Sequence, residues 1–436
     1  MGASLGWDTP RRIAAVILLI ALAGACRSPE DDRSDARLGP GRPEVRLRHI
    51  EGSSVKVEQL VGDADKETKK PTFNLTASRY GILGTDLGHS FEHNGKAYFL
   101  FGDTVGRHGG DVIGVSTSTN PEGPLALDFL TNGDGSYLRV EPPGVSMEGN
   151  EVPVAGISLG GVMYVAVKTN YTRFGLTETT LLTSFDESKH AFTVLRELSR
   201  MPVGRFITMS FVQAPAELQG MPYPGPQVLM FGSGQYRRSN AYLSTIPVSG
   251  FASGEGTRYF AGLSAEGQPI WSDYELASAP IIEHSTIGDL SVQYVRDLGL
   301  WIAVYDSRSP RGIVLRYAQE PWGPWSSAQI IFEPIKDDAW GVFIHNPKEP
   351  ADGLGGPVIG PNADAMRTQG GYYAPYLIER FTRVENDQLT LQYVLSTWNP
   401  YVVVRMRSSL AIERGKLART QPVTGDQAEL VALERK

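Results

Sequence analysis

Short apolar segments separated by tight turns dominate the pattern from residue 81 to about residue 412. Each repeat opens on a polar or acidic residue, runs as an apolar strand, turns, and returns as a second apolar strand with a polar end. No window sustains the i, i+3, i+4, i+7 spacing of an amphipathic helix, so the pattern predicts an all-β domain. The five first strands open at Asp86, Glu151, Ser210, Asp289 and Tyr373, and the second strands end at Asp103, Lys168, Ser233, Asp306 and Ser396.

The number and length of these repeats predict how the strands are arranged. Each repeat is longer than the ~40–50 residues of a minimal propeller blade, so the blades carry inserted loops. Antiparallel meanders expose strand edges unless the sheets close into a ring or pack radially. We therefore predict a five-bladed β-propeller, with a β-sandwich as the competing architecture.

The first residues have the pattern of a lipoprotein signal peptide. Arg11 and Arg12 precede an apolar run, and small residues lead to Cys26, the only cysteine of the chain. We expect acylation of Cys26 and a protein that is exported and lipid-anchored to the bacterial cell envelope; an ordinary secretory signal is the alternative. The expected segments are a signal peptide at 1–26, a flexible tether at 27–75, the propeller at 76–415 and a tail at 416–436.

Composition narrows the classes of partner and cofactor. A formal net charge of −7 and the lack of a basic stripe argue against a nucleic-acid partner. The seven histidines show neither HxH nor HExxH spacing, so we expect no catalytic metal and no cofactor, although clustered carboxylates could hold a structural Ca²⁺. A monomer is the expected state.

The clearest repeat suggests a pair of interacting carboxyl groups. Its two strands are joined by Asn94 and Gly95, a dipeptide typical of two-residue hairpin turns. Symmetric pairing about that turn would place Asp86 directly opposite Asp103, with Cβ atoms ~4.5–5.5 Å apart. Two carboxylates this close cannot both ionise freely, so one should have a raised pKa, as a general acid requires. Alternatively, each Asp caps a strand end.

If the blades superpose, the polar strand ends share one concave face of the ring. Asp289 and Lys168 would then face the same funnel as Asp86, and Glu151 could supply a second carboxylate of a glycosidase pair. An ordinary surface salt bridge is the alternative for Glu151. Sugar sites also use flat aromatic faces. The expected substrate-binding residues are Asn150, Lys168, Tyr373, Trp398 and Asn399.

Three segments resemble a known family. Residues 84–88 read GTDLG, residues 99–104 read FLFGDT and residues 396–401 read STWNPY. They look like the DUF4185 family, and the resemblance extends from about residue 81 to 412. That family is similar to five-bladed propeller glycosidases, and some of its members are endo-D-arabinanases that cut the D-arabinan of mycobacterial cell walls. The resemblance implies that Asp86 and Asp103 form the acidic motif, with Trp398 and Asn399 in a C-terminal motif.

Together these patterns predict a glycoside hydrolase whose substrate is a cell-wall polysaccharide, and the family resemblance implies arabinan. Asp86, Asp103 and Glu151 are the expected catalytic set, and Asp289 is expected to support them by electrostatics or binding. The stereochemical outcome stays open, because the separation of the two carboxyl groups decides it. A surface propeller that binds glycan without cutting it is the alternative function; a structural interaction propeller would need an apolar rim.

Overall fold

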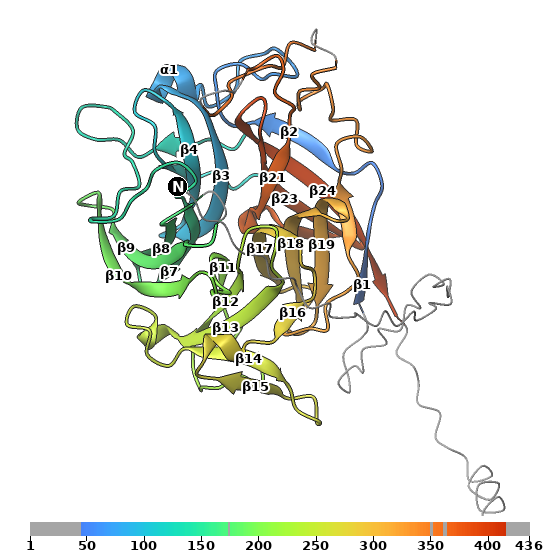
Figure 1. Cartoon of the computed structure of the whole chain (residues 1–436). Helices are drawn as coiled ribbons and strands as arrows, with labels where there is room; N and C mark the ends of the chain where they lie inside the picture. Colours follow the sequence, from blue (N-terminus) through green and yellow to red (C-terminus); the bar gives the residue numbers. More distant parts are fainter. Residues whose placement is uncertain (1–44, 173–174, 349–351, 361–363, 416–436) are drawn as a thin grey trace, which may run out of the picture. The chain divides into compact units, whose positions relative to one another are not determined.

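The computed structural model describes residues 45–172, 175–348, 352–360 and 364–415, and its fold is almost entirely β-structure. Five antiparallel sheets form the blades of a five-bladed β-propeller (Figure 1). The predicted fold class is therefore confirmed. The predicted signal peptide, Cys26 and the tail at 416–436 lie outside the described residues. Within the described ranges, no helix is both long and apolar enough to cross a membrane.

Each of the first four blades is built from consecutive strands. Blade I contains β3 (Ile82–His93), β4 (Lys96–Gly106), β5 (Val112–Ser116) and β6 (Asp128–Phe129). Blade II contains β7 (Pro153–Leu159), β8 (Val162–Thr169), β9 (Thr179–Asp186) and β10 (Ala191–Arg200). Blade III contains β11 (Thr208–Gln213), β12 (Gln227–Ser233), β13 (Ala241–Pro247), β14 (Arg258–Leu263), β15 (Pro269–Ser272) and β16 (Pro280–Ile282). Blade IV contains β17 (Ile287–Val295), β18 (Leu300–Arg308), β19 (Arg311–Ala318) and β20 (Gln329–Phe332). The short helices are α1 (Thr76–Tyr80), η1 (Val248–Gly250), η2 (Glu275–Ala277) and η4 (Glu379–Phe381).

Blade V joins the two ends of the described chain. It contains β21 (Tyr372–Leu377), β22 (Arg383–Glu385), β23 (Gln388–Thr397) and β24 (Val402–Arg414), together with β1 (Val45–His49) and β2 (Val55–Gln59). Both early strands pair antiparallel with β24, β1 along its C-terminal part and β2 along its N-terminal part. The flexible tether predicted for 27–75 was therefore wrong for residues 45–59, where the chain forms β1 and β2 of this sheet.

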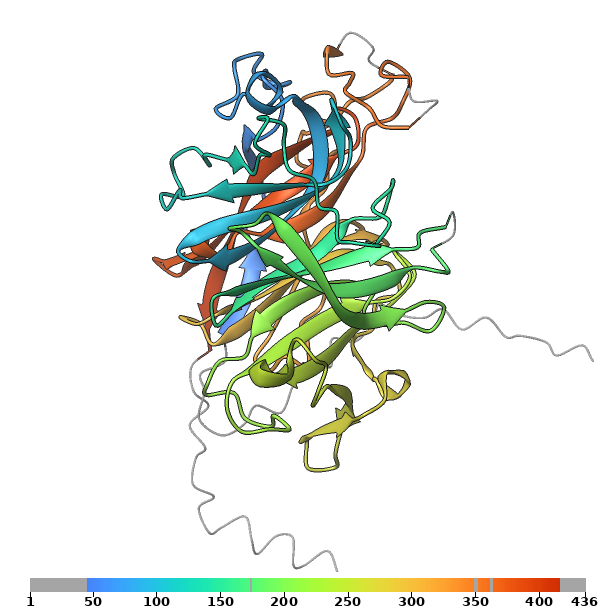
Figure 2. The same ribbon diagram turned by 90° about the vertical axis from the view of Figure 1, so that its left-hand side faces the viewer.

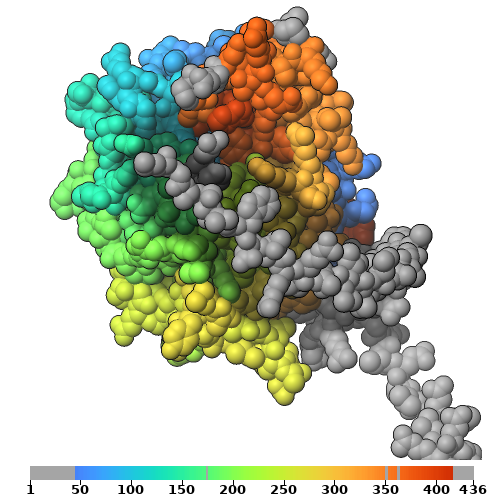
Figure 3. All heavy atoms as spheres, in the orientation of Figure 1, coloured from blue at the N-terminus to red at the C-terminus, as the bar shows by residue number. Residues whose placement is uncertain are grey.

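The innermost strands close the ring. β3 contacts β7, β7 contacts β11, β11 contacts β17, β17 contacts β21, and β21 returns to β3. Figure 3 shows the chain colours in order around this ring, with the red blade V beside the blue-to-cyan blade I. Each sheet is covered on both faces by its neighbours, so inner and second strands read as continuous apolar runs. All seven residues of β12, for example, are buried.

The inner strands share a direction along the ring axis, which gives the ring two different ends. One end holds the starts of β3, β17 and β21 and the ends of β4, β8 and β18. In Figure 2, the green segment between β8 and β9 and the orange segment between β20 and β21 lie on the same side of the ring. The β8–β9 and β20–β21 segments therefore border the end where the predicted site residues lie.

Candidate active site

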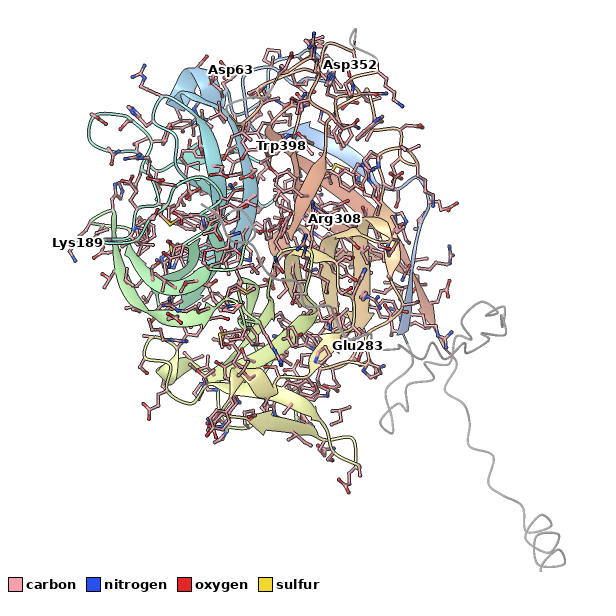
Figure 4. The ribbon with its side chains drawn as sticks, viewed as in Figure 1. Asp63, Lys189, Glu283, Arg308, Asp352 and Trp398 are labelled. Carbon is pink, nitrogen blue, oxygen red and sulfur yellow. The ribbon has the colours of Figure 1, made fainter. Side chains whose placement is uncertain are left out.

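Five aspartates gather at this end of the ring, and we call the group the carboxylate mouth. Blade I supplies three of them, at the start of β3, on β4 and just before β5, and blade IV supplies two, on β17 and β18. Figure 4 shows Arg308, at the end of β18, and Trp398, just after β23, toward the inside of the ring, whereas Lys189 lies at its outer edge. The members of the carboxylate mouth are Asp86, Asp103, Asp111, Asp289 and Asp306.

A bulge in β3 changes the register predicted for the first pair. Asp86 lies opposite Gly102 rather than Asp103, and Leu87 lies opposite Phe101. The predicted register was therefore wrong by one residue. The cause is local: Leu87 and Gly88 have φ angles of +59° and +101°, which place an extra residue in β3 before the pairing resumes.

Asp86 lies at the base of the mouth and has only 7% of its surface exposed. The Tyr373 hydroxyl donates a hydrogen bond of 2.8 Å to its Oδ2. Its buried Oδ1 meets no donor within hydrogen-bonding geometry, although the nearby Tyr401 hydroxyl also lowers the pKa of Asp86. Burial and the neighbouring Asp103 carboxylate raise the pKa of Asp86 to about 7. A Cβ atom at Gly102 would lie 2.7 Å from Oδ1, so the glycine makes room for this carboxyl group.

Asp103 is the more accessible partner of Asp86. Its side chain is half-buried and accepts the backbone N–H of Asn150, at 3.2 Å to Oδ1 and 3.0 Å to Oδ2. Burial raises the pKa of Asp103 above its ordinary value, although the Asn150 N–H and the charge of Lys168 oppose this shift. Although its strand register differs from the prediction, the expected electrostatic coupling between Asp86 and Asp103 is present.

Asp111 is a member of the mouth that the sequence analysis did not identify. It is 1% exposed, and its Oδ1 accepts the backbone N–H of Asp103 at 2.8 Å, while its Oδ2 has no partner. Burial and the nearby Asp103 raise the pKa of Asp111 well above its ordinary value. No local motif marks it, because it lies in the short connection between β4 and β5 rather than at a strand end of the repeat.

The blade IV pair occupies the corresponding strand positions. Asp289 accepts hydrogen bonds from the hydroxyls of Tyr236, at 3.1 Å, and Tyr376, at 3.2 Å. Its own backbone N–H donates to Asp306 Oδ1 at 2.8 Å. Arg237 forms an ion pair with Asp306, with Nη2 2.6 Å from Oδ2. Burial and Asp306 raise the pKa of Asp289 to about 6.

Lys168 links the two pairs electrostatically. It lies in β8 of blade II, and its positive charge lowers the pKa of both Asp103 in blade I and Asp289 in blade IV. Its Nζ forms an ion pair of 3.1 Å with the buried Glu178. The structure thus brings together Asp86, Asp103, Asp289, Lys168 and Tyr373, as the sequence analysis expected.

Glu151 has a different environment from the one predicted for a catalytic carboxylate. Its Oε2 accepts hydrogen bonds from the Ser146 hydroxyl and from the Glu148 backbone N–H at 3.0 Å, and Oε1 accepts the Tyr171 N–H at 3.0 Å. Burial alone would raise the pKa of Glu151, but these hydrogen bonds hold it below its ordinary value. Both oxygens are thus engaged in fixing loops, and we do not retain Glu151 in the catalytic set.

The expected substrate-binding residues also separate into two groups. Asn150 is exposed, and Trp398 is 37% exposed with its ring perpendicular to that of Tyr401, so both can meet a ligand. Asn399 is fully buried. Its amide accepts the Gly356 N–H at 2.8 Å and donates to two backbone carbonyls of the segment before β21. Asn399 therefore anchors a loop, and its expected contact with substrate is not supported.

Two further features are the lack of a metal-binding cluster among the described residues and a buried His–Asp pair. Among the residues that the structure describes, no group of three or more His, Cys, Asp and Glu side chains is arranged to hold a metal ion. His345 and Asp352 form a buried pair, with Nδ1 2.8 Å from Oδ2, and the His345 N–H donates to the Asn399 carbonyl. This pair stabilises the same loop that Asn399 anchors.

Comparisons with known proteins agree with the extent of the domain. The family model described as "Domain of unknown function (DUF4185)" matches residues 72–407. "Notoamide biosynthesis cluster protein J'" of Aspergillus versicolor is 25% identical over 328 residues, which cover 67% of this chain and 82% of that protein.

Solved structures to which this chain is similar include a xylosidase and a putative glycoside hydrolase. One is a xylan β-1,4-xylosidase from Bacillus halodurans C-125, with 9% identity and a TM-score of 0.37, covering 78% of this chain and 54% of that chain. Another is a putative glycoside hydrolase from Bacteroides ovatus, with 8% identity and a TM-score of 0.41, covering 83% of this chain and 96% of that chain.

Proposed function

This chain belongs to the DUF4185 family, and we propose that its carboxylate mouth hydrolyses glycosidic bonds. One observation carries the proposal: Asp86, with a pKa of about 7, lies beside Asp103, whose carboxylate is more accessible and is held by the Asn150 N–H. A glycosidase needs one carboxyl group that is protonated and a second that is ionised on the same site. The blade I pair offers two neighbouring carboxyl groups for these two roles.

In this proposal Asp86 acts as the general acid. Its proton passes to the glycosidic oxygen as the bond to the anomeric carbon breaks, so the leaving sugar departs as a neutral alcohol. Asp103 supplies the second carboxylate, which either attacks the anomeric carbon or removes a proton from the attacking water. Asp289 and Lys168 set the electrostatic field, and Asn150 and Trp398 border the bound sugar.

For the substrate we propose arabinan cut at internal bonds, with the D-arabinan of mycobacterial-type cell walls as the specific case. The GTDLG, FLFGDT and STWNPY segments support this choice, because they resemble family members with that activity. Acylation at Cys26 and export to the cell envelope would bring the domain to such a polymer; both remain part of the proposal.

The test uses the purified chain from Arg27 to Lys436, which contains every described strand, including β1 and β2. The chain is incubated with mycobacterial arabinogalactan and, separately, with plant L-arabinan, and released oligosaccharides are separated by chromatography. We expect oligomers from the D-arabinan, and none from the Asp86→Asn or Asp103→Asn chain. Asp297→Asn, in an exposed turn of blade IV, is the matched control and should retain full activity.

Two other results would change the assignment. Binding of either polysaccharide without release of products would favour the glycan-binding propeller. Equal hydrolysis by the Asp86→Asn chain would show that the blade I pair is not the catalytic pair. Proton NMR of the first products would then distinguish retention from inversion at the anomeric carbon.

A further inference from the structure

The end of the ring opposite the carboxylate mouth holds a cavity of about 1100 Å³, which we call the far cavity. The same inner strands that begin at the mouth line it near their other ends. On β3, for instance, Asp86 and Glu92 are roughly 20 Å apart at ~3.3 Å per residue. Among the described residues, the lining of the far cavity includes none of the five aspartates of the mouth. It is therefore a separate space. Its lining includes His89, Phe211, Gln213, Tyr223, Gln293 and Glu379.

The wall combines amide groups with aromatic faces. Gln213 ends β11 with an exposed side chain and supplies the open amide of the wall. Gln293, in β17, is buried, and its amide is hydrogen-bonded to the Thr382 hydroxyl. Phe211 and Tyr223 contribute aromatic rings, the latter from the proline-rich segment between β11 and β12. Amides that bind hydroxyl groups, beside flat apolar rings, match the two kinds of surface that a sugar presents.

His89 gives the cavity a buried polar group that lacks a partner. It is only 4% exposed, and its Nδ1 has no hydrogen-bond partner. Burial lowers the pKa of His89 to about 4, so the imidazole is neutral near pH 7 and has one donor and one acceptor nitrogen. A buried polar atom without a partner is costly. Because Nδ1 is also shielded from solvent, the His89 ring reports on a ligand in the cavity rather than binding it directly.

The charges around the cavity argue against an anionic ligand. Glu92 is paired with Arg380, and Arg296 with Glu217 at 3.2 Å. Glu379 is the carboxylate of the lining without an ion pair among the described residues. Solvent reaches its side chain, although protein surrounds it on several sides. Burial and Glu92 raise the pKa of Glu379. No described residue donates a hydrogen bond to its carboxyl group, which can accept from a sugar hydroxyl.

We propose that the far cavity is a second binding site, specific for a neutral oligosaccharide. Its volume exceeds the ~300–1,000 Å³ of ordinary small-molecule sites, so it accommodates several sugar units. The site holds a glycan segment on the face away from the carboxylate mouth. This inference does not depend on hydrolysis at the mouth.

The test follows the imidazole of His89 in the Asp86→Asn chain from Arg27 to Lys436, which keeps the probe intact. A linear arabinofuranose hexasaccharide is titrated, and long-range ¹H–¹⁵N NMR records the histidine side chains, with His89 assigned through His89→Gln. We expect a saturable shift of the His89 nitrogens and none at the exposed His108. Inorganic phosphate, titrated separately, should leave His89 unchanged.

A blocking variant separates the two ends of the ring. Gln213→Trp should weaken the oligosaccharide-dependent shift at least tenfold, whereas Gln268→Trp, an exposed glutamine in the β14–β15 turn, should not. If Gln213→Trp fails to fold, Glu379→Gln serves instead, with weaker binding expected. Unchanged His89 resonances at saturating oligosaccharide, or a shift that survives both variants, would overturn the inference. Hydrolysis by the same variants, with Asp86 restored, tests the proposed function independently.

Discussion

Blades I and IV place an aspartate pair at the same strand positions, yet the two pairs have opposite environments. In blade IV, Arg237 neutralises Asp306, and two tyrosine hydroxyls occupy both oxygens of Asp289. In blade I, Asp86 keeps one oxygen without a partner, and Asp103 is held by a backbone N–H. A repeated fold thus offers the same carboxyl positions several times, and the neighbours decide which pair is available for proton transfer.

The largest expected difference between the pairs concerns turnover. Asp86→Asn and Asp103→Asn should each lower kcat on arabinan by about 10²–10⁴-fold, since they remove the acid or its partner. Asp289→Asn should cost about tenfold or less, because it changes only the surrounding field. Initial rates on the same substrate measure all three. A larger loss in Asp289→Asn than in Asp86→Asn would reverse the assignment of the reactive pair.

Glycine substitutions should separate activity from stability. At Gly102, a Cβ atom would lie 2.7 Å from Asp86 Oδ1; at Gly288, it would lie 2.3 Å from Asp306 Oδ2. Either alanine should destabilise the fold by ~1–3 kcal/mol through overpacking. Gly102→Ala should also lower kcat, whereas Gly288→Ala should mainly lower the unfolding free energy in urea. Gly149→Ala, where nothing lies within 4 Å, is the control for both.

Raised pKa values predict how stability depends on pH. Unfolded aspartates titrate near ~4, so protonated Asp86 and Asp289 favour the folded state at low pH. Their contribution is full below about pH 4 and is lost as pH rises through about 6 for Asp289 and about 7 for Asp86. The melting temperature should therefore fall between pH 4 and 7. In Asp86→Asn the fall in melting temperature between pH 6 and 7 should be shallower than in the wild-type chain, and an unchanged fall would contradict the assigned shift.

The smallest predicted effect concerns two tyrosines, Tyr373 beside Asp86 and Tyr376 beside Asp289. The kcat/KM of the wild-type chain should halve near pH 7 and fall about tenfold per unit above it, as Asp86 loses its proton. Tyr373 donates to the Asp86 carboxylate and so lowers its pKa. Tyr373→Phe should move this limb upward by about one pH unit. Tyr376→Phe, which affects Asp289, should leave the limb in place.

Most of the fold could be predicted because each blade repeats a local pattern of strand, turn and strand. The part of the fold that the sequence did not predict is a pairing between strands far apart in the chain. β1 and β2 are short, carry several charged residues, and pair with β24 more than 300 residues later, so nothing in their own sequence predicts a strand in a closed sheet. The sequence repeats were enough to predict a five-bladed ring. Its closure depends on the pairing of β1 and β2 with β24, which the repeats do not reveal.

The site could be predicted where a residue's place at a strand end determines its position in the ring. Asp86, Asp103, Lys168 and Asp289 converge because the blades superpose. The exact register failed because the positive φ angles of Leu87 and Gly88 create a bulge. The roles of Glu151 and Asn399 depend on hydrogen bonds to distant loop atoms, which residue type and spacing do not reveal.

The pairing of β1 and β2 with β24 also orders the assembly of the molecule. A chain that is made or exported from its N-terminus produces two of the strands of blade V first and their partner last. Blades I to IV are each formed from consecutive strands and can be completed along the way, but the ring stays open until β24 arrives. The carboxylate mouth depends on Tyr373 of that same blade. A chain truncated before β24 would keep Tyr373 but lose the strand that pairs with β1, β2 and β23, so we expect neither a closed ring nor a well-positioned Tyr373.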